Sequence, residues 1–378
     1  MRVEAAIPAD VLRAVRAPFL AAGAQALDAP ILQPLGLLLD LAGESLRERL
    51  FVVSSDGGEE SCLRPDFTLP ALMAHIANGS ATGRYLYEGH AFRVAPAGTT
   101  RAEEFLQIGL EAFETGDAAE ADAEIAALAW RSSVAGGRTD LTLLLGDAGL
   151  FAAFVDALEI TPVKAARLKR ALASPRRLAA ELRDLGAAER GEGARGGLAR
   201  LLAGLGETEA EAVMEEIWIL AGIEPIGGRP AGEIIRRLAQ RSETAGAPPL
   251  DAERRGLIET FLTIDGEPRA ALAAIGDLAG DRRPTLESVL SNWQRRLAAF
   301  AAHGIPSGAT RFSAAFGRSF GYYDGPLFEV RSRALGADQP VAAGGRYDGL
   351  PVRLGARDAA GAVGCMVRPG RAWAGGRP

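Results

Sequence analysis

Cysteine and histidine are both scarce in this chain of 378 residues. The two cysteines, Cys62 and Cys365, lie far apart and form no CxxC spacing, so we expect no disulfide framework and predict that both thiols are reduced. The three histidines likewise lack the spacing that is typical of zinc ligands. The sequence therefore predicts no metal site and no bound cofactor.

Long apolar runs are also missing. The most apolar stretch near the start, PILQPLGLLLDLAG, is interrupted by Gln33, Pro34 and Asp40, so it is not expected to span a bilayer. The first residues, MRVEAAIPADVLRAVRAPFLAAGAQAL, include acidic side chains and contain no apolar core beside a cleavage site. This favours an amphipathic helix over a signal peptide. We therefore predict a cytoplasmic protein without a membrane partner.

The chain has no surplus of basic charge. Its formal net charge is −6, whereas nucleic-acid-binding proteins usually carry a basic patch or stripe, so no nucleic-acid partner is expected. A hydrophobic content of 48% with 24% charged residues is ordinary for a globular protein, and the length favours two domains. No repeat of about 20–50 residues is evident, which argues against a solenoid.

Three regions of the chain differ in their patterns. Residues 1–147 combine helix with the strand-like runs LFVVSS, RYLYEGHAFRV, EEFLQIGLEAF and LTLLLG. Residues 148–290 are rich in Ala, Leu, Arg and Glu and contain the helical segments FAAFVDALE, TPVKAARLKRALA, PRRLAAELRDLG, LARLLAGL, EAEAVMEEIWILAG and AGEIIRRLAQR. Residues 291–378 return to strand patterns: RFSAAF, YYDGPLFEVRS, PVAAGG and AAGAVGCMV. We predict an α/β protein of the α+β type, whose two strand-rich regions form one sheet and whose middle region is a helical insertion.

The stretch YEGHAFRVAPAGTTRAEEFLQIGLEAFE predicts a hairpin with polar residues where a sheet usually buries apolar ones. Alternate residues of a strand share a face, which gives two sets: Tyr85, Tyr87, Gly89, Ala91, Arg93 and Phe105, Gln107, Gly109, Glu111, Phe113. The small residues leave space above the sheet, and buried charges need counter-charges. A zwitterionic ligand would supply both signs. Alternatively, Arg93 and Glu111 pair with each other, or this face is solvated.

A second candidate segment is SCLRPDFTLPALMAHI. Pro65 favours an extended conformation for the residue before it, so a turn is expected to present Asp66 and Thr68 ahead of a helix. An acid and a hydroxyl on such a turn suit recognition of an amine. The alternative is that one of them only caps the helix.

The third segment comprises GRSFGYYDGPLFEV and VAAGGRYDGL. Glycines on both sides of Arg346, Tyr347 and Asp348 allow close backbone approach, and this would let the Tyr347 ring reach into a site. A hairpin loop would need the same glycines without any functional reason.

Taken together and in this order, these segments resemble histidyl-tRNA synthetase, a class II synthetase. LRPDFT resembles that family's LRPEGT turn, and YEGHAFR and QIGLEAFE resemble the two strands of motif 2. GRSFGYYDGPLFE resembles the RGLDYYxxTVFE motif, and AAGGRYDGL is nearly identical to its counterpart. APILQPLGLLLDLAGE fits motif 1, with Pro30 at the motif's proline. The resemblance covers about residues 25–147 and 293–371. It implies a class II aminoacyl-tRNA synthetase-like antiparallel sheet flanked by helices, and a histidine site. The histidine contacts that it implies are Asp66, which stands where the family has glutamate, and Thr68, Arg93, Gln107, Glu111, Arg318, Tyr322, Tyr323 and Tyr347.

The departures from that family concern ATP and tRNA. Motif 2 reads FRxE, with a glutamate for adenine, and here Ala95 takes its place. The motif 2 loop, VAPAGTTRAEE, keeps only Arg101 as a basic residue, and its acids would repel a triphosphate. Motif 3 is replaced by RPGR, in which we expect Pro369 to disfavour the helix that should carry Arg371. The chain ends seven residues after Arg371, so no anticodon-binding domain is expected.

A histidine pocket without ATP or tRNA machinery resembles the regulatory subunit of ATP phosphoribosyltransferase, a paralogue of the synthetase in histidine biosynthesis. The helical middle also resembles the longer bacterial members of this family. The resemblance implies a non-catalytic subunit that binds L-histidine, forms a class II-like dimer, joins a short catalytic subunit in a hetero-octamer of four plus four, and confers feedback regulation. Two alternatives remain open: a divergent histidine-activating ligase and an RNA-binding relic.

Overall fold

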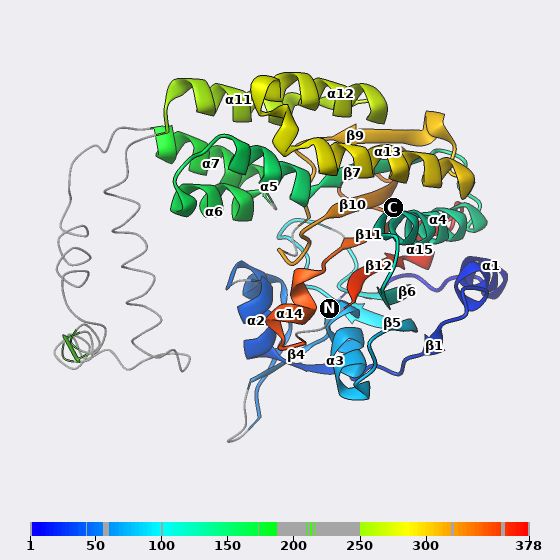
Figure 1. Cartoon of the computed structure of the whole chain (residues 1–378). Coiled ribbons are helices and arrows are strands. Elements are labelled where there is room, and N and C mark those ends of the chain that lie inside the picture. The colour runs from blue at the N-terminus through cyan, green and yellow to red at the C-terminus, as the bar shows by residue number, and fades with distance from the viewer. Residues whose placement is uncertain are drawn as a thin grey trace.

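A computed structural model describes residues 2–42, 44–55, 60–99, 101–172, 174–186, 250–318, 321–356 and 360–376, together with Glu209, Ala212, Val213 and Glu216. Figure 1 shows the arrangement of the helices and strands. Within these residues no helix is long and apolar enough to cross a membrane. Cys62 and Cys365 are both free and buried.

The first region supplies helices and strands in alternation. In chain order these are α1 (Ala9–Leu20), β1 (Gln25–Ala26), β2 (Leu32–Pro34), α2 (Leu35–Ala42), the 3-10 helix η1 (Glu44–Arg49), β3 (Val52–Val53), β4 (Ser61–Leu63), α3 (Thr68–Asn78), β5 (Gly83–Phe92), β6 (Glu104–Glu114), α4 (Ala118–Ala135) and β7 (Leu141–Asp147). Local signals set several ends: the Asp117 side chain accepts from the backbone of Ala119 at the start of α4, and Gly79 ends α3 with a left-handed backbone.

The described part of the middle region consists of helices joined by short connections, apart from the two-residue strand β8. Its elements are α5 (Ala148–Ala157), α6 (Pro162–Ala171), α7 (Pro175–Gly186), α11 (Ala252–Thr263), β8 (Asp265–Gly266), α12 (Pro268–Ala279) and η2 (Gly280–Thr285). The predicted helices at 198–205 and 231–241 lie outside the described residues, as does most of the one at 209–222. The division at 147/148 and 290/291 remains a prediction.

The last region returns to the sheet. It contains α13 (Glu287–Ala302), η3 (Ser307–Ala309), β9 (Thr310–Ser313), β10 (Pro326–Ser332), β11 (Ala342–Arg346), α14 (Gly349–Arg353), β12 (Gly361–Val367) and α15 (Pro369–Ala372). Pro369 was expected to disfavour a helix here, and this expectation was wrong. It is the first residue of α15, a position where proline is tolerated because its missing N–H would have no partner in the helix.

Strands from the first and last regions interleave in one nine-stranded sheet, which β8 of the middle region completes at one edge. Its order is β1-β5-β6-β12-β11-β10-β7-β9-β8. The pairings are antiparallel except β1 with β5 and β7 with β9, which are parallel. A separate three-stranded sheet has the order β2-β4-β3. The prediction that two distant strand-rich regions build one flanked sheet is therefore confirmed, with parallel pairs added near its edges.

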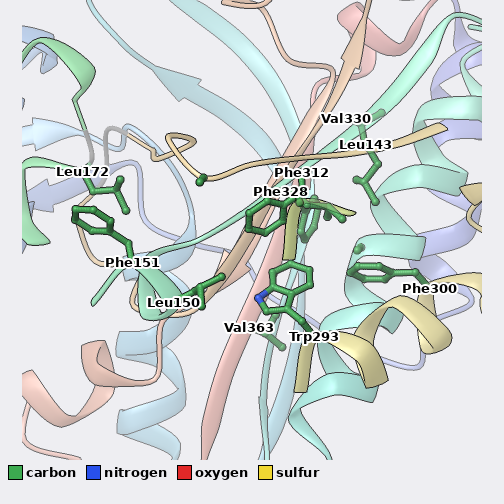
Figure 2. Close-up of a cluster of buried hydrophobic side chains, with 14 of the residues drawn as sticks. Leu143, Leu150, Phe151, Leu172, Trp293, Phe300, Phe312, Phe328, Val330 and Val363 are labelled. Atoms are coloured by element: carbon green, nitrogen blue, oxygen red, sulfur yellow. The ribbon is translucent and has the colours of Figure 1, made fainter. Parts of the chain in front are cut away.

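One face of the large sheet carries the main core. The helix α4 packs against β10, β11 and β12, and both α1 and α13 pack against α4. Figure 2 shows Trp293 of α13 among Phe312, Phe328 and Leu143 from the strands. Phe151 of α5 belongs to the same cluster, so the middle region shares this core.

The opposite face of the sheet is hollowed by small residues. Glu111 of β6 is in register with Tyr85 of β5 on one side and with Gly364 of β12 on the other. Gly364 pairs with Gly345 of β11 in turn. A Cβ at Gly364 would meet the Glu111 carboxylate, so the missing side chain makes room for this acid above the centre of the sheet.

Candidate functional site

A cavity lies on this hollowed face, between the sheet and the start of α3. It is lined by Asp66, Thr68, Tyr87, Arg93, Glu111, Arg318, Tyr322, Tyr323, Ala343, Gly364, Cys365 and Met366. The lining comes from four segments distant in sequence: the turn before α3, the β5–β6 hairpin, the chain before β10, and strands β11 and β12. Its volume is about 20 Å³, which is space for roughly one water molecule.

Glu111 is the centre of the site. Its side chain is 2% exposed and accepts three hydroxyl hydrogen bonds. Thr68 Oγ1 donates to Oε1 at 2.9 Å and Tyr87 OH at 3.4 Å, while Tyr347 OH donates to Oε2. Three converging donors on one buried carboxylate fix its position, and they favour its charged form. Burial nevertheless dominates and raises the pKa of Glu111 to about 8.

Asp66 continues the polar lining toward Arg93. Tyr322 OH lies 3.4 Å from both Asp66 Oδ2 and Thr68 Oγ1. Burial raises the pKa of Asp66, while the Arg93 charge acts in the opposite direction. Arg93 is half-buried, and its loss of contact with water lowers its pKa to about 10. Its Nε donates to the carbonyl of Pro65 at 2.8 Å. The site therefore holds two acids, and the guanidinium of Arg93 lies close enough to Asp66 for the two charges to interact.

Arg318 adds a second guanidinium to the lining. Its Nη1 donates to Glu329 Oε1 at 2.6 Å, and the other oxygen of Glu329 is held by Arg331 at 2.7 Å. The Nε of Arg318 is buried and has no hydrogen-bond partner among the described residues. One carboxylate, that of Glu329, thus serves the guanidinium groups of both Arg318 and Arg331.

Gln107 is fully buried, and neither atom of its side-chain amide finds a hydrogen-bond partner in the described parts of the chain. It shares the site-facing side of β6 with Glu111, four residues away, and pairs in register with Gly89. A buried amide without partners is rare in folded proteins and calls for an explanation. Gln107 does not belong to the cavity lining, so the structure leaves its predicted role untested.

The structure brings together most of the predicted residues. Seven of the nine line the cavity: Asp66, Thr68, Arg93, Glu111, Arg318, Tyr322 and Tyr323. Tyr347 reaches Glu111 from outside the lining. Tyr87 was missed as a site residue, although the alternation of β5 places it on this face. Its ring stacks on Phe67 at 4.4 Å, which aims its hydroxyl at Glu111.

The alternatives left open by the sequence are also answered in part. Tyr85 is the residue in register with Glu111, and Arg93 follows the end of β5, so hydroxyl groups rather than Arg93 surround the Glu111 carboxylate. The N-cap residue of α3 is Phe67, whose side chain makes no capping hydrogen bond. The Thr68 hydroxyl donates to Glu111 and does not cap the helix. Asp66 does accept a hydrogen bond from the Thr68 backbone, so it serves both the turn and the cavity.

The other basic residues near the sheet edge are engaged elsewhere. Arg101 pairs with Asp338, and Arg371 donates to the carbonyl of Pro340 at 3.0 Å. Arg368 pairs with Glu4 at 2.9 Å and covers the ring of Phe105 at 3.7 Å. Within the described residues, no group of three or more His, Cys, Asp or Glu side chains is arranged to hold a metal ion.

The raised pKa of Glu111 predicts a pH-dependent stability. Because the folded state holds this proton more tightly than the unfolded chain, the free energy of unfolding should fall as pH rises from the ordinary value of 4.5 to about 8. The expected loss is on the order of a few kcal/mol. The free energy of unfolding can be measured with urea at several pH values across this range. It should depend less steeply on pH for Glu111→Gln than for the unmodified protein. An equal pH dependence of stability in the two proteins would show that Glu111 ionises as freely in the folded state as in the unfolded chain.

Comparisons with known proteins agree on the class. A family model described as histidyl-tRNA synthetase matches residues 3–222 and 231–369. A solved structure titled as an ATP phosphoribosyltransferase regulatory subunit/histidyl-tRNA synthetase from Bacillus halodurans superposes with a TM-score of 0.61 at 19% identity, covering 96% of this chain and 77% of that chain. The histidyl-tRNA synthetase from Nostoc sp. PCC 7120 gives 0.61 at 15% identity, covering 97% and 72%. The chain thus has the fold of the histidyl class II synthetases.

Curated relatives are more similar in sequence. The chain is 37% identical over 357 residues to the ATP phosphoribosyltransferase regulatory subunit of Mesorhizobium japonicum, which covers 92% of each chain. It is 33% identical over 363 residues to the protein of the same name from Brucella anthropi, which covers 94% of each. The chain belongs to the family of ATP phosphoribosyltransferase regulatory subunits.

Proposed function

We propose that this chain is a non-catalytic regulatory subunit that binds L-histidine and controls ATP phosphoribosyltransferase at the first step of histidine biosynthesis. The observation that carries the proposal is the polarity of the cavity. The acids Glu111 and Asp66 and the guanidinium groups of Arg93 and Arg318 all line it. Buried charges of both signs require counter-charges, and an amino-acid zwitterion supplies both.

The arrangement suggests how the ligand lies. Its ammonium group would meet Glu111, Thr68 and Asp66, and its carboxylate would meet Arg93. With only about 20 Å³ enclosed, the ligand enters when Tyr322 turns away from Asp66 and Thr68. The two groups that Tyr322 now contacts at 3.4 Å would then be contacted by the ligand. Gln107, whose amide has no hydrogen-bond partner among the described residues, is a further predicted contact on this face.

Several features argue against activation of the amino acid with ATP. Ala95 stands where motif 2 of the class II synthetases that this chain resembles has a glutamate that recognises adenine. Arg101 and Arg371 are engaged by Asp338 and by the backbone of Pro340, so neither points freely at a phosphate. We therefore expect no aminoacylation, and we expect the bound amino acid to act as a signal and not as a substrate.

The partner follows from the family. Its members carry the name of a subunit, so we propose that this chain joins a short-form catalytic subunit, as four plus four in a hetero-octamer, after pairing with itself as a class II-like dimer. Regulation requires that histidine bind two states of the assembly with different affinities. In this scheme the catalytic subunit needs this chain for activity and responds to histidine only in its presence.

Two measurements test the proposal. Calorimetry on the full chain should give saturable heat with L-histidine, and the chain should co-purify with a short catalytic subunit and raise its activity. Absence of both would contradict the proposal. Histidine-dependent exchange of pyrophosphate into ATP well above background would favour the divergent ligase instead.

A further inference from the structure

The turn that carries Tyr347 is tied to the opposite side of the sheet by buried charges. Arg346, the last residue of β11, donates from Nε to Asp122 Oδ1 of α4 at 2.8 Å and from Nη1 to Asp348 Oδ1 at 2.9 Å. Arg296 of α13 holds the second oxygen of Asp122 at 2.6 Å. Arg346, Asp122 and Arg296 are each less than a tenth exposed, so the two bonds to Asp122 are shielded from water.

The same turn also fixes the segment that carries Tyr322 and Tyr323. Asp324, the next residue, donates its backbone N–H to the carbonyl of Arg346 at 3.2 Å. Its carboxylate accepts from the backbone of Asp348 at 3.0 Å and of Gly349 at 2.6 Å. One turn therefore anchors Tyr322, Tyr323 and Tyr347, three of the tyrosines around the cavity.

The helices behind this turn form one unit. Besides Arg296 with Asp122, the pair α4 and α13 is joined by Arg295 with Asp117 and by His303 with Glu120. Arg346 contacts α4 at two points, since its Nη2 also donates to the carbonyl of Ala118 at 3.2 Å. The turn is thus fastened to a rigid pair of helices and not to a loop.

We infer that Arg346 and Asp122 are positioning residues for ligand binding, which hold Tyr347 against Glu111 from the far side of the sheet without touching the ligand. This inference rests on the proposed function. Tyr347 and Arg346 are adjacent in sequence and point to opposite faces, because the first reaches Glu111 and the second reaches α4. Loss of the hydrogen bonds that the Arg346 guanidinium makes would free the turn. The Tyr347 hydroxyl would then no longer be held at the Glu111 carboxylate.

A double-mutant cycle separates positioning from general damage. Arg346→Met should weaken histidine binding by roughly 3- to 30-fold, the range of couplings through residues that do not touch a ligand. In a Tyr347→Phe background the same change should have less than about a third of that effect, because the hydroxyl that it positions is gone. Arg346→Lys keeps the charge but loses the planar fork, and should restore part of the affinity.

Asp122→Asn preserves shape and serves as the second variant if Arg346→Met does not fold. Arg84→Met is the matched control, since Arg84 also ties the sheet to α4, through Glu124, but does not contact the Tyr347 turn. It should leave the dissociation constant for histidine unchanged. If Arg346→Met weakened histidine binding equally with and without the Tyr347 hydroxyl, the positioning role would be wrong, while the proposed function would stand. Failure of the unmodified protein to bind histidine would overturn the proposed function as well.

Discussion

Glu111→Gln is expected to weaken histidine binding by about 30-fold or more. Removing one partner of a buried, hydrogen-bonded charge pair typically costs about 2–5 kcal/mol of binding free energy, and each 1.4 kcal/mol is about tenfold in the dissociation constant. Glu111 is the most enclosed acid of the cavity, with its oxygens fixed by Thr68, Tyr87 and Tyr347. A nearby ammonium group would favour the charged form of Glu111, whereas a glutamine keeps the shape but cannot become a carboxylate.

Glu114→Gln is the control for this experiment. Glu114 lies on the same strand, three residues further on, but it points to the other face and pairs with Arg84. Calorimetry should give the same dissociation constant for Glu114→Gln as for the unmodified protein. If Glu111→Gln also binds within about threefold of that value, the ligand ammonium does not sit at Glu111, and the proposed orientation is wrong.

The hairpin could be predicted because its information is local. Alternation along β5 and β6 assigns Tyr85, Gln107 and Glu111 to one face without knowledge of the fold, and the register confirms this assignment. Pro65 and the apolar helix after it likewise predict the turn that presents Asp66 and Thr68. The resemblance then grouped these local pieces with Arg318 and Tyr347, and the structure places most of them in the lining of one cavity.

The rest depends on contacts between distant segments. Nothing local in GAVGCMV indicates that Gly364 lies opposite Glu111, because the pairing of β12 with β6 joins residues about 250 positions apart. The contact of Arg346 with Asp122 has the same character. Pro369 shows the opposite failure: a correct local rule on proline was applied to a helix interior, whereas the residue occupies the first position of α15.

Gly364→Ala is expected to close the site. A Cβ at this position would lie 2.5 Å from Cδ of Glu111 and 3.0 Å from the carbonyl oxygen of Leu110. Because the strand backbone at Leu110 can shift less than a side chain can, the Glu111 side chain would have to move away from its hydroxyl partners. Such overpacking typically costs about 1–3 kcal/mol of stability, and we expect histidine affinity to fall by about tenfold or more because the same carboxylate is displaced.

Gly36→Ala is the matched control, because Gly36 lies in α2 and an added Cβ would meet nothing within 4 Å. This change should leave affinity intact and raise the free energy of unfolding by up to about 1 kcal/mol, since alanine favours helix over glycine. Urea unfolding and calorimetry on both variants give the comparison. A Gly364→Ala protein with unchanged stability and affinity would contradict the packing of β12 against Glu111.

The cause of a Gly364→Ala defect can be isolated by removing the group it displaces. In a Glu111→Ala background the collision with the carboxylate is gone, so adding Gly364→Ala should cost less stability than it does in the unmodified protein. Binding would not recover, because the acid that the ammonium needs is absent. Recovered stability without recovered binding would show that Gly364 is required to make space for Glu111, and that Glu111 is required for the ligand.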